Sequence, residues 1–188
     1  MLSVVCSQCM ISADVRWPEL DDPDANSAQS VDLGHPTGTH STPDALCLLS
    51  LDGSPALCVR LRQTSGESYT FRDAQFWNGL FVIGWGHAFY VVDVDSLTAT
   101  RHDLSAYFSY IHAGDVLLIA SAERVLRVGA DGAVVWTSDP VAIDGITFSN
   151  VDSDFVDGDG EWDPPGGWKP FRLRLRDGTV VSGGQPDW

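Results

Sequence analysis

The sequence predicts an all-β protein, and two observations support that fold class. Apolar runs of strand length are joined by turn dipeptides such as Asp52-Gly53 and Asp131-Gly132, a strong short-range signal for β-hairpins. Residues 115–136 combine these features most completely, because they read as strand, small-residue turn, strand, Asp-Gly turn and strand. We therefore expect repeated antiparallel meanders of three to four strands each.

The second observation is an internal repeat with a period of 36 residues. Residues 80–103 align with residues 116–139 at that offset, and both contain an apolar strand, a polar turn, a second apolar strand, an Asp-led turn and a third strand. A period of this size with strand content indicates repeated β units rather than helical repeats. Residues 170–181 contain a weaker copy, and the hairpin around Asp52-Gly53 is a candidate for a fourth, most degraded copy.

The segment VLLIASAERVLRVGADGAVVW, residues 116–136, resembles the blade repeats of bacterial β-propellers of the quinoprotein type. In those repeats a strand leads to a small-residue turn, a second strand, an acidic-Gly turn and a strand ending in Trp. The resemblance covers residues 80–138 and 170–181 and concerns architecture only, so it implies no quinone cofactor. A closed ring of four blades, at roughly 40 residues per blade, would take nearly the whole chain. The pattern fits a propeller-like or a two-sheet arrangement.

The length of 188 residues suits one domain with a substantial core, so we expect a single all-β domain over residues 1–188. Residues 12–43 are polar and rich in turn-forming residues, which favours a loop or a weakly structured arm. His35 and His40 lie in this segment. Because a proline and a glycine between them disfavour a helix, we expect both histidines in a solvated loop.

The N-terminal residues lack the basic lead-in of a signal peptide, and no apolar run approaches the ~18 residues that span a bilayer. We therefore expect a cytoplasmic protein without membrane association, whose cysteines are thiols. Cys6 and Cys9 have the spacing of half a zinc site or of a redox pair. Because Cys47 and Cys58 make no second close pair, buried thiols are the favoured interpretation.

The charge is strongly negative, since 11 Lys and Arg residues stand against 26 Asp and Glu residues for a formal net charge of −15. Such a surface repels phosphate backbones and anionic lipids, so we expect neither a nucleic-acid nor a membrane partner. It fits a basic protein partner or a bound cation. A general compositional bias towards Asp and Arg explains the same numbers without any partner.

Residues 152–168 are the densest acidic segment of the chain. Asp157, Asp159 and Glu161 alternate there as candidate calcium ligands, since Ca²⁺ takes about six to eight oxygen atoms. The segment lacks the EF-hand spacing. The alternatives are therefore a non-EF calcium loop and a solvated acidic turn between strands, and no cofactor other than calcium is expected.

Trp162, Asp163 and Trp168 surround a Pro-Pro-Gly-Gly loop in the same segment. If exposed, the two indoles could hold a partner's side chain or stack on a sugar. Inward packing, with the indoles capping the end of a sheet, is the favoured alternative because seven Trp are too many to leave in water.

The chain contains no nucleophile-elbow, P-loop or HExxH motif, so an enzyme is not the favoured interpretation. We rank first a non-enzymatic acidic protein-binding module, with an immunity-type protein that neutralises a basic partner as its concrete version. The second class is a calcium- or carbohydrate-binding β domain centred on residues 152–168. The third is a metal-dependent hydrolase that uses the five histidines, which lie in different repeat units.

Overall fold

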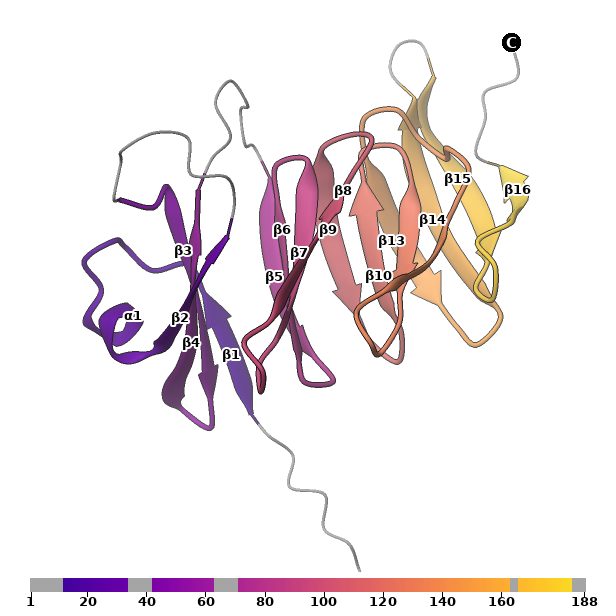
Figure 1. Cartoon of the computed structure of the whole chain (residues 1–188). Coiled ribbons are helices and arrows are strands. Elements are labelled where there is room, and N and C mark those ends of the chain that lie inside the picture. Colours follow the sequence, from indigo (N-terminus) through magenta and orange to yellow (C-terminus); the bar gives the residue numbers. More distant parts are fainter. Residues whose placement is uncertain (1–11, 34–41, 63–70, 163–165, 184–188) are drawn as a thin grey trace, which may run out of the picture. The chain divides into compact units, whose positions relative to one another are not determined.

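The computed structural model of the chain describes residues 12–33, 42–62, 71–162 and 166–183 (Figure 1). These residues form sixteen strands and one short helix, which confirms the all-β fold class. The chain divides into two compact units, unit 1 with residues 1–65 and unit 2 with residues 66–188, and we describe each by itself. The single domain expected over the whole chain stays a prediction.

Unit 1 is a four-stranded sheet with one short helix. Its elements are β1 (Ala13–Arg16), α1 (Pro23–Ser27), β2 (Gln29–Leu33), β3 (Ala45–Leu51) and β4 (Ser54–Leu61). The strand order is β1-β3-β4-β2, in which β2 is parallel to β4 and the other pairs are antiparallel. The turn of the β3–β4 hairpin contains Asp52 (φ 49°) and Gly53 (φ 78°), and two successive positive φ angles are typical of a type I′ turn.

The loop expected over residues 12–43 is wrong for the described part of that segment, which contains β1, α1 and β2. β1 and β2 are edge strands of four and five residues with mostly exposed side chains, so they lack the apolar alternation that identifies a strand. They flank the hairpin in which Cys47 and Cys58 are buried, as expected for these two thiols. The residues Cys6, Cys9, His35 and His40 lie outside the described part of the chain.

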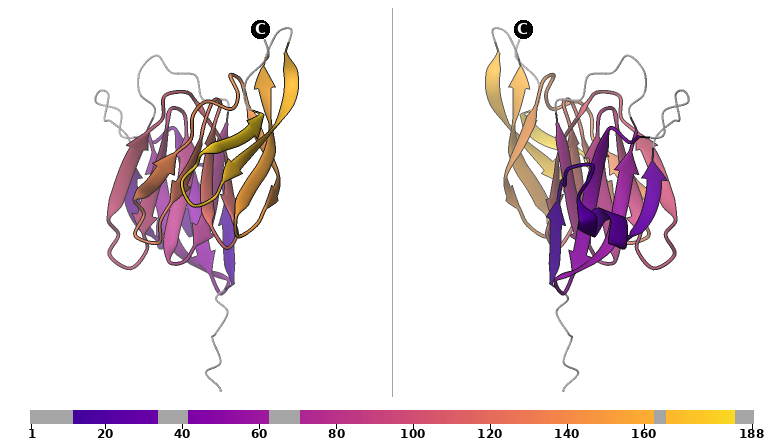
Figure 2. Two further views of the ribbon diagram at one scale, coloured as in Figure 1. Left: turned by 90° about the vertical axis from the view of Figure 1, so that its right-hand side faces the viewer. Right: turned by 90° about the vertical axis from the view of Figure 1, so that its left-hand side faces the viewer.

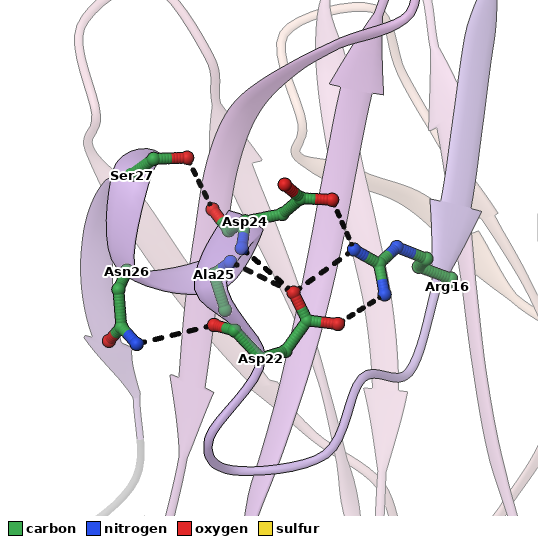
Figure 3. Close-up of polar contacts among 6 residues, drawn as sticks. All are labelled: Arg16, Asp22, Asp24, Ala25, Asn26 and Ser27. Atoms are coloured by element: carbon green, nitrogen blue, oxygen red, sulfur yellow. Dashed lines mark hydrogen bonds and ion pairs between the residues drawn. The ribbon is translucent and has the colours of Figure 1, made fainter.

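Helix α1 begins where it does because Asp22 is its N-cap (Figure 3). The Asp22 carboxylate accepts hydrogen bonds from the backbone N–H of Asp24 at 2.9 Å and of Ala25 at 3.4 Å. The Arg16 guanidinium, at the end of β1, donates to the two Asp22 carboxylate oxygens at 2.5 and 3.2 Å and to the Asp24 carboxylate at 2.8 Å. Polar residues that suggest a loop in the sequence thus start a helix and tie it to a strand.

Unit 2 contains three four-stranded antiparallel sheets, each a meander whose strands follow one another along the chain (Figure 1). The first sheet consists of β5 (Arg72–Trp77), β6 (Leu80–Trp85), β7 (Ala88–Asp93) and β8 (Ala99–Asp103). The second consists of β9 (Phe108–Ala113), β10 (Leu117–Ser121), β11 (Val125–Val128) and β12 (Val134–Thr137). The third consists of β13 (Ile146–Val151), β14 (Phe155–Trp162), β15 (Gly167–Arg174) and β16 (Val180–Gly183). The antiparallel meanders predicted from the sequence are confirmed here.

The repeat in the sequence corresponds to the last three strands of a sheet. At the offset of 36 residues, the hairpin β6–β7 falls on β10–β11 and strand β8 falls on β12. The turn Asp177-Gly178 joins β15 to β16, just as an Asp-Gly turn joins β11 to β12. Asp52-Gly53 instead joins the two central strands of unit 1, so the suggested fourth copy does not occupy an equivalent place in its sheet.

The strands of the three sheets of unit 2 overlap one behind another in the views of Figure 2. Two apolar cores lie between these sheets. The core between the first and second sheets contains the fully buried rings of Phe89 and Phe108. The core between the second and third sheets contains Trp136, Val156 and Phe171. The loop before β9 meets the loop before β13, where the Tyr107 hydroxyl donates to the Asp144 carbonyl at 2.8 Å.

Candidate functional site

The acidic residues proposed as calcium ligands lie on a strand and not on a turn or loop. Asp157, Asp159 and Glu161 belong to β14, where they alternate with buried residues and therefore share one half-buried face. Residues two apart on a strand are separated by roughly 6.5–7 Å, which spreads the three carboxylates along β14. Asp157 is also bound by Arg172, whose Nε and Nη2 donate to its two carboxylate oxygens at 2.6 and 2.9 Å.

The described residues include no group of three or more His, Cys, Asp or Glu side chains that could hold a metal ion. Calcium binding by residues 157–161 stays a prediction, to which this geometry adds no support. Gly158 and Gly160 occupy the buried positions that alternate with the acids on β14. A Cβ at Gly158 would overlap the Thr147 carbonyl, and one at Gly160 would overlap the Val141 carbonyl. Close backbone approach thus requires glycine at both positions.

The two tryptophans of this segment have different environments. Trp162, the last residue of β14, is buried with 8 % of its surface exposed, as the inward-packing alternative predicts. Trp168, the second residue of β15, is 50 % exposed, so inward packing is wrong for this indole, which is available to a partner. Asp163 lies outside the described residues.

Trp168 lies beside Glu161 and beside the loop that precedes β13. Trp168 and Glu161 are direct cross-strand neighbours in the β14–β15 ladder. On the other side of β14, the Ile143 N–H donates to the Glu161 carbonyl and the Glu161 N–H donates to the Gly145 carbonyl, both at 2.9 Å. A Cβ at Gly145 would lie 3.5 Å from Trp168 Cη2 and 3.7 Å from Glu161 Oε2. The indole and the carboxylate therefore both reach over Gly145.

Tyr107, in the loop before β9, joins this group from the neighbouring sheet. Its hydroxyl donates to the Asp144 carbonyl at 2.8 Å and also to the Asp144 carboxylate. Its ring stacks on Phe71, with centroids 5.7 Å apart and planes 13° from parallel. Burial, the hydrogen bond to Asp144 and the negative charges of Asp144 and Glu161 raise the pKa of Tyr107 to about 12. The phenol is therefore a neutral donor that orients Asp144 at physiological pH.

These side chains form one surface, which we call the aromatic–acidic patch. It consists of Phe71, Tyr107, Ile143, Asp144, Glu161 and Trp168. Phe71, Ile143 and Trp168 are each about half exposed, at 48, 46 and 50 %. Among the described residues, the ion pairs include neither Asp144 nor Glu161. The patch thus combines exposed apolar side chains with two carboxylates that have no counter-ion in the described part of the chain.

A groove of about 480 Å³ lies at the other end of β9, between the β9–β10 and β13–β14 turns. Its polar lining includes His112, Asp115 and Asp152. The Asp152 carboxylate already accepts hydrogen bonds from the N–H groups of Asp154 and Phe155, both at 2.8 Å. That carboxylate therefore caps its own turn, as Asp side chains commonly do, and serves the fold.

The described histidines are dispersed and do not assemble a metal site. His102 stacks on Phe89, with centroids 4.6 Å apart, and His112 meets the edge of Phe148 at 6.0 Å. His87 is exposed on the turn between β6 and β7. The metal-dependent hydrolase stays a prediction, and elemental analysis without stoichiometric zinc, iron or manganese would exclude it.

Comparison with known proteins bears on the fold alone. The four-stranded meanders of unit 2 define it as a β protein built from blade-type repeats. Neither a protein-family model nor a curated protein matches the sequence. Among solved structures, the chain is similar to the WD40 domain of Neurospora crassa Pan2, with a TM-score of 0.48 and 11 % sequence identity. The match covers 73 % of this chain and 45 % of that one, so the chain spans less than half of the Pan2 structure.

No helix in the described residues has the length and apolar character needed to cross a bilayer.

Proposed function

We propose that the protein is a non-enzymatic binding module that holds a basic protein partner on the aromatic–acidic patch. The observation that carries this proposal is the exposure of Trp168 beside Glu161, a carboxylate that no described cation neutralises. Interface centres are enriched in aromatic residues that exclude water around the contact. The patch offers three half-exposed apolar side chains for this purpose.

The distribution of charge supports a basic partner. Several of the arginines are already paired inside the protein, as in Arg16 with Asp22, Arg101 with Asp103 and Arg172 with Asp157. The chain has 26 acidic residues and only 11 basic ones, so most carboxylates cannot pair with a basic side chain of the same chain. The resulting net charge of −15 produces a negative electrostatic potential around the protein. A negative surface of this kind accelerates the approach of a basic protein and repels an acidic one.

An immunity-type protein is a concrete version of this proposal. Rapid capture of a basic toxin requires long-range electrostatic attraction, and a tight complex requires a buried apolar centre. The net charge would supply the first and the aromatic–acidic patch the second. In this version the partner is a basic enzyme whose activity is blocked on binding.

The test compares two variants in capture from a lysate of the native host, followed by measurement with the purified partner. Trp168→Ala/Glu161→Gln removes the centre of the patch, whereas Asp159→Asn removes the same charge one step along the same face of β14. We expect the double variant to lose the partner and the Asp159 variant to keep it. We also expect affinity to fall steeply between about 50 and 500 mM salt, because screening weakens charge attraction. Salt-independent binding, or equal loss in both variants, contradicts the proposal.

Carbohydrate binding is a second candidate, favoured by the half-exposed indole of Trp168 beside the Glu161 carboxylate. An exposed aromatic face can pack on the apolar face of a sugar ring while the carboxylate accepts hydroxyl hydrogen bonds. Binding to a glycan array that Trp168→Ala abolishes would support this candidate over the first. Its calcium form is tested by calorimetry with Ca²⁺, where the absence of heat, or equal heat from Asp157→Asn/Asp159→Asn, excludes it.

A further inference from the structure

The protein holds one of its own arginines between a ring and a carboxylate on the face of β14 and β15. The Arg172 guanidinium lies over the Phe155 ring, 5.1 Å from its centroid. It also donates two hydrogen bonds to Asp157, at 2.6 and 2.9 Å. The guanidinium thus contacts a ring and a carboxylate at the same time. This arrangement is favourable because the ring face and the carboxylate both attract the cation.

The same combination occurs on the first sheet of unit 2. The Arg101 guanidinium lies 5.9 Å from the centroid of the Tyr90 ring, and its Nε donates to Asp103 at 2.7 Å. Tyr90 and Arg101 are direct cross-strand neighbours in the β7–β8 ladder. Two separate sheets therefore use the same three components.

A third position has the ring and the carboxylate but no cation. Trp168 and Glu161 are cross-strand neighbours on the same two strands, and on the same face, as Phe155, Asp157 and Arg172. Among the described residues, no ion pair involves Glu161, and no cation lies over Trp168. The neighbouring Lys169 alternates to the opposite face, since its register partner is the buried Gly160.

We propose that Trp168 and Glu161 form a binding position for an arginine side chain of the partner. The guanidinium stacks on the exposed face of the Trp168 indole and donates to the Glu161 carboxylate. Arginine suits the position better than lysine, because its planar cation stacks on a ring and donates two parallel hydrogen bonds to a carboxylate. Asp144, held nearby by Tyr107, adds a second negative charge. This inference rests on the proposed protein-binding function and specifies what that surface recognises.

The test is an NMR titration of the ¹⁵N-labelled full chain with three small probes. Acetyl-arginine amide is expected to shift the Trp168 indole N–H resonance, assigned with Trp168→Leu, in a saturable way. Acetyl-citrulline amide, which has nearly the same shape without the charge, is expected to leave it unchanged. Nα-acetyl-lysine amide, whose side-chain ammonium group is free and charged, is expected to bind about two- to fivefold more weakly than the arginine probe. An equal response to arginine and citrulline overturns the proposal.

Matched variants locate the binding position. Glu161→Gln and Trp168→Leu are each expected to weaken binding of the arginine probe about two- to fivefold, and Asp159→Asn less than about 1.5-fold. The dispersion of each spectrum shows that the variant is folded. Loss in Asp159→Asn as large as in Glu161→Gln would mean that overall charge, and not this position, attracts the probe.

The outcomes separate this inference from the proposed function. Capture of a basic partner through the patch, with no binding of acetyl-arginine amide, overturns the arginine position and leaves the binding module in place. The reverse result is saturable, Trp168-dependent binding of the probe when no captured partner is lost by the patch variants. That result supports the arginine position and overturns the proposed binding of a basic protein through the patch.

Discussion

Replacing Gly160 by alanine is expected to destabilise unit 2 and to displace the loop that carries Ile143 and Asp144. The new Cβ would overlap the Val141 carbonyl oxygen and would lie 3.0 Å from the Ala142 Cβ. Val141 and Ala142 are completely buried in the core between the second and third sheets, so neither can move freely. The clash must therefore be relieved by separating this loop from β14.

The loss of stability can be calculated from the strain in the core and from the backbone hydrogen bonds that this separation weakens. The Val141 N–H donates to the Glu123 carbonyl and the Ile143 N–H donates to the Glu161 carbonyl, both at 2.9 Å. Overpacking of a well-packed core costs about 1–3 kcal/mol, and each weakened hydrogen bond contributes about 0.5–1.5 kcal/mol. Since two such hydrogen bonds are weakened, we expect the Gly160→Ala variant to lose about 2–6 kcal/mol of unfolding free energy.

Urea unfolding followed by tryptophan fluorescence measures this loss, with Gly145→Ala as the matched control. Gly145 also borders Glu161, but a Cβ there would make only ordinary contacts of 3.5 Å or longer. The control is expected to be unchanged or to gain up to about 1 kcal/mol, because alanine restricts the unfolded chain. Equal stability of the Gly160→Ala variant and the wild-type protein would refute the reasoning about backbone contact.

Three further results are expected. Tyr107, whose pKa is raised to about 12, stabilises the fold fully below pH 10 and loses this contribution as pH rises towards 12; Asp144→Asn should lower that pKa in an ultraviolet titration of tyrosine ionisation. The Arg172 guanidinium lowers the pKa of Asp157, so the stability that this carboxylate contributes is present above the ordinary Asp pKa and is lost as pH falls through the lowered pKa. Asp157→Asn should therefore reduce the urea midpoint more at pH 7 than in acid; an equal reduction at both would contradict this. Asp22→Ala should destabilise unit 1, seen as faster amide exchange in α1, because two N–H groups lose their acceptor.

The strands of unit 2 could be predicted because their turns have local chemical signatures. Asn78 and Gly79 both have positive φ angles, 50° and 83°, and such residues are preferred in two-residue hairpin turns. Strands β6 and β10 are buried along their whole length and read as continuous apolar runs. In unit 1 the same reasoning fails at β1 and β2, which pair with β3 and β4 over long sequence distances and have exposed faces.

The candidate site could be predicted only where its residues are close in sequence. Glu161 and Trp168 belong to one hairpin, so the dense acidic segment already directs attention to them. Phe71, Tyr107 and Asp144 join them through the packing of three sheets, and no spacing in the sequence connects these residues. The acidic-Gly alternation of β14 has the period of a strand, which is the signal that a loop interpretation overlooks.

The acidity of β14 therefore has two explanations, one for each part of the strand. β10 lies between two sheets and is buried throughout, whereas β14 alternates between buried residues and half-buried acids. Asp157 is paired with Arg172. Glu161 has the same place in the alternation but no cation among the described residues, and its neighbour is an exposed indole. A solvated sheet face accounts for an acid at position 161 but not for the exposed Trp168 beside it, and this pairing is what favours a binding role.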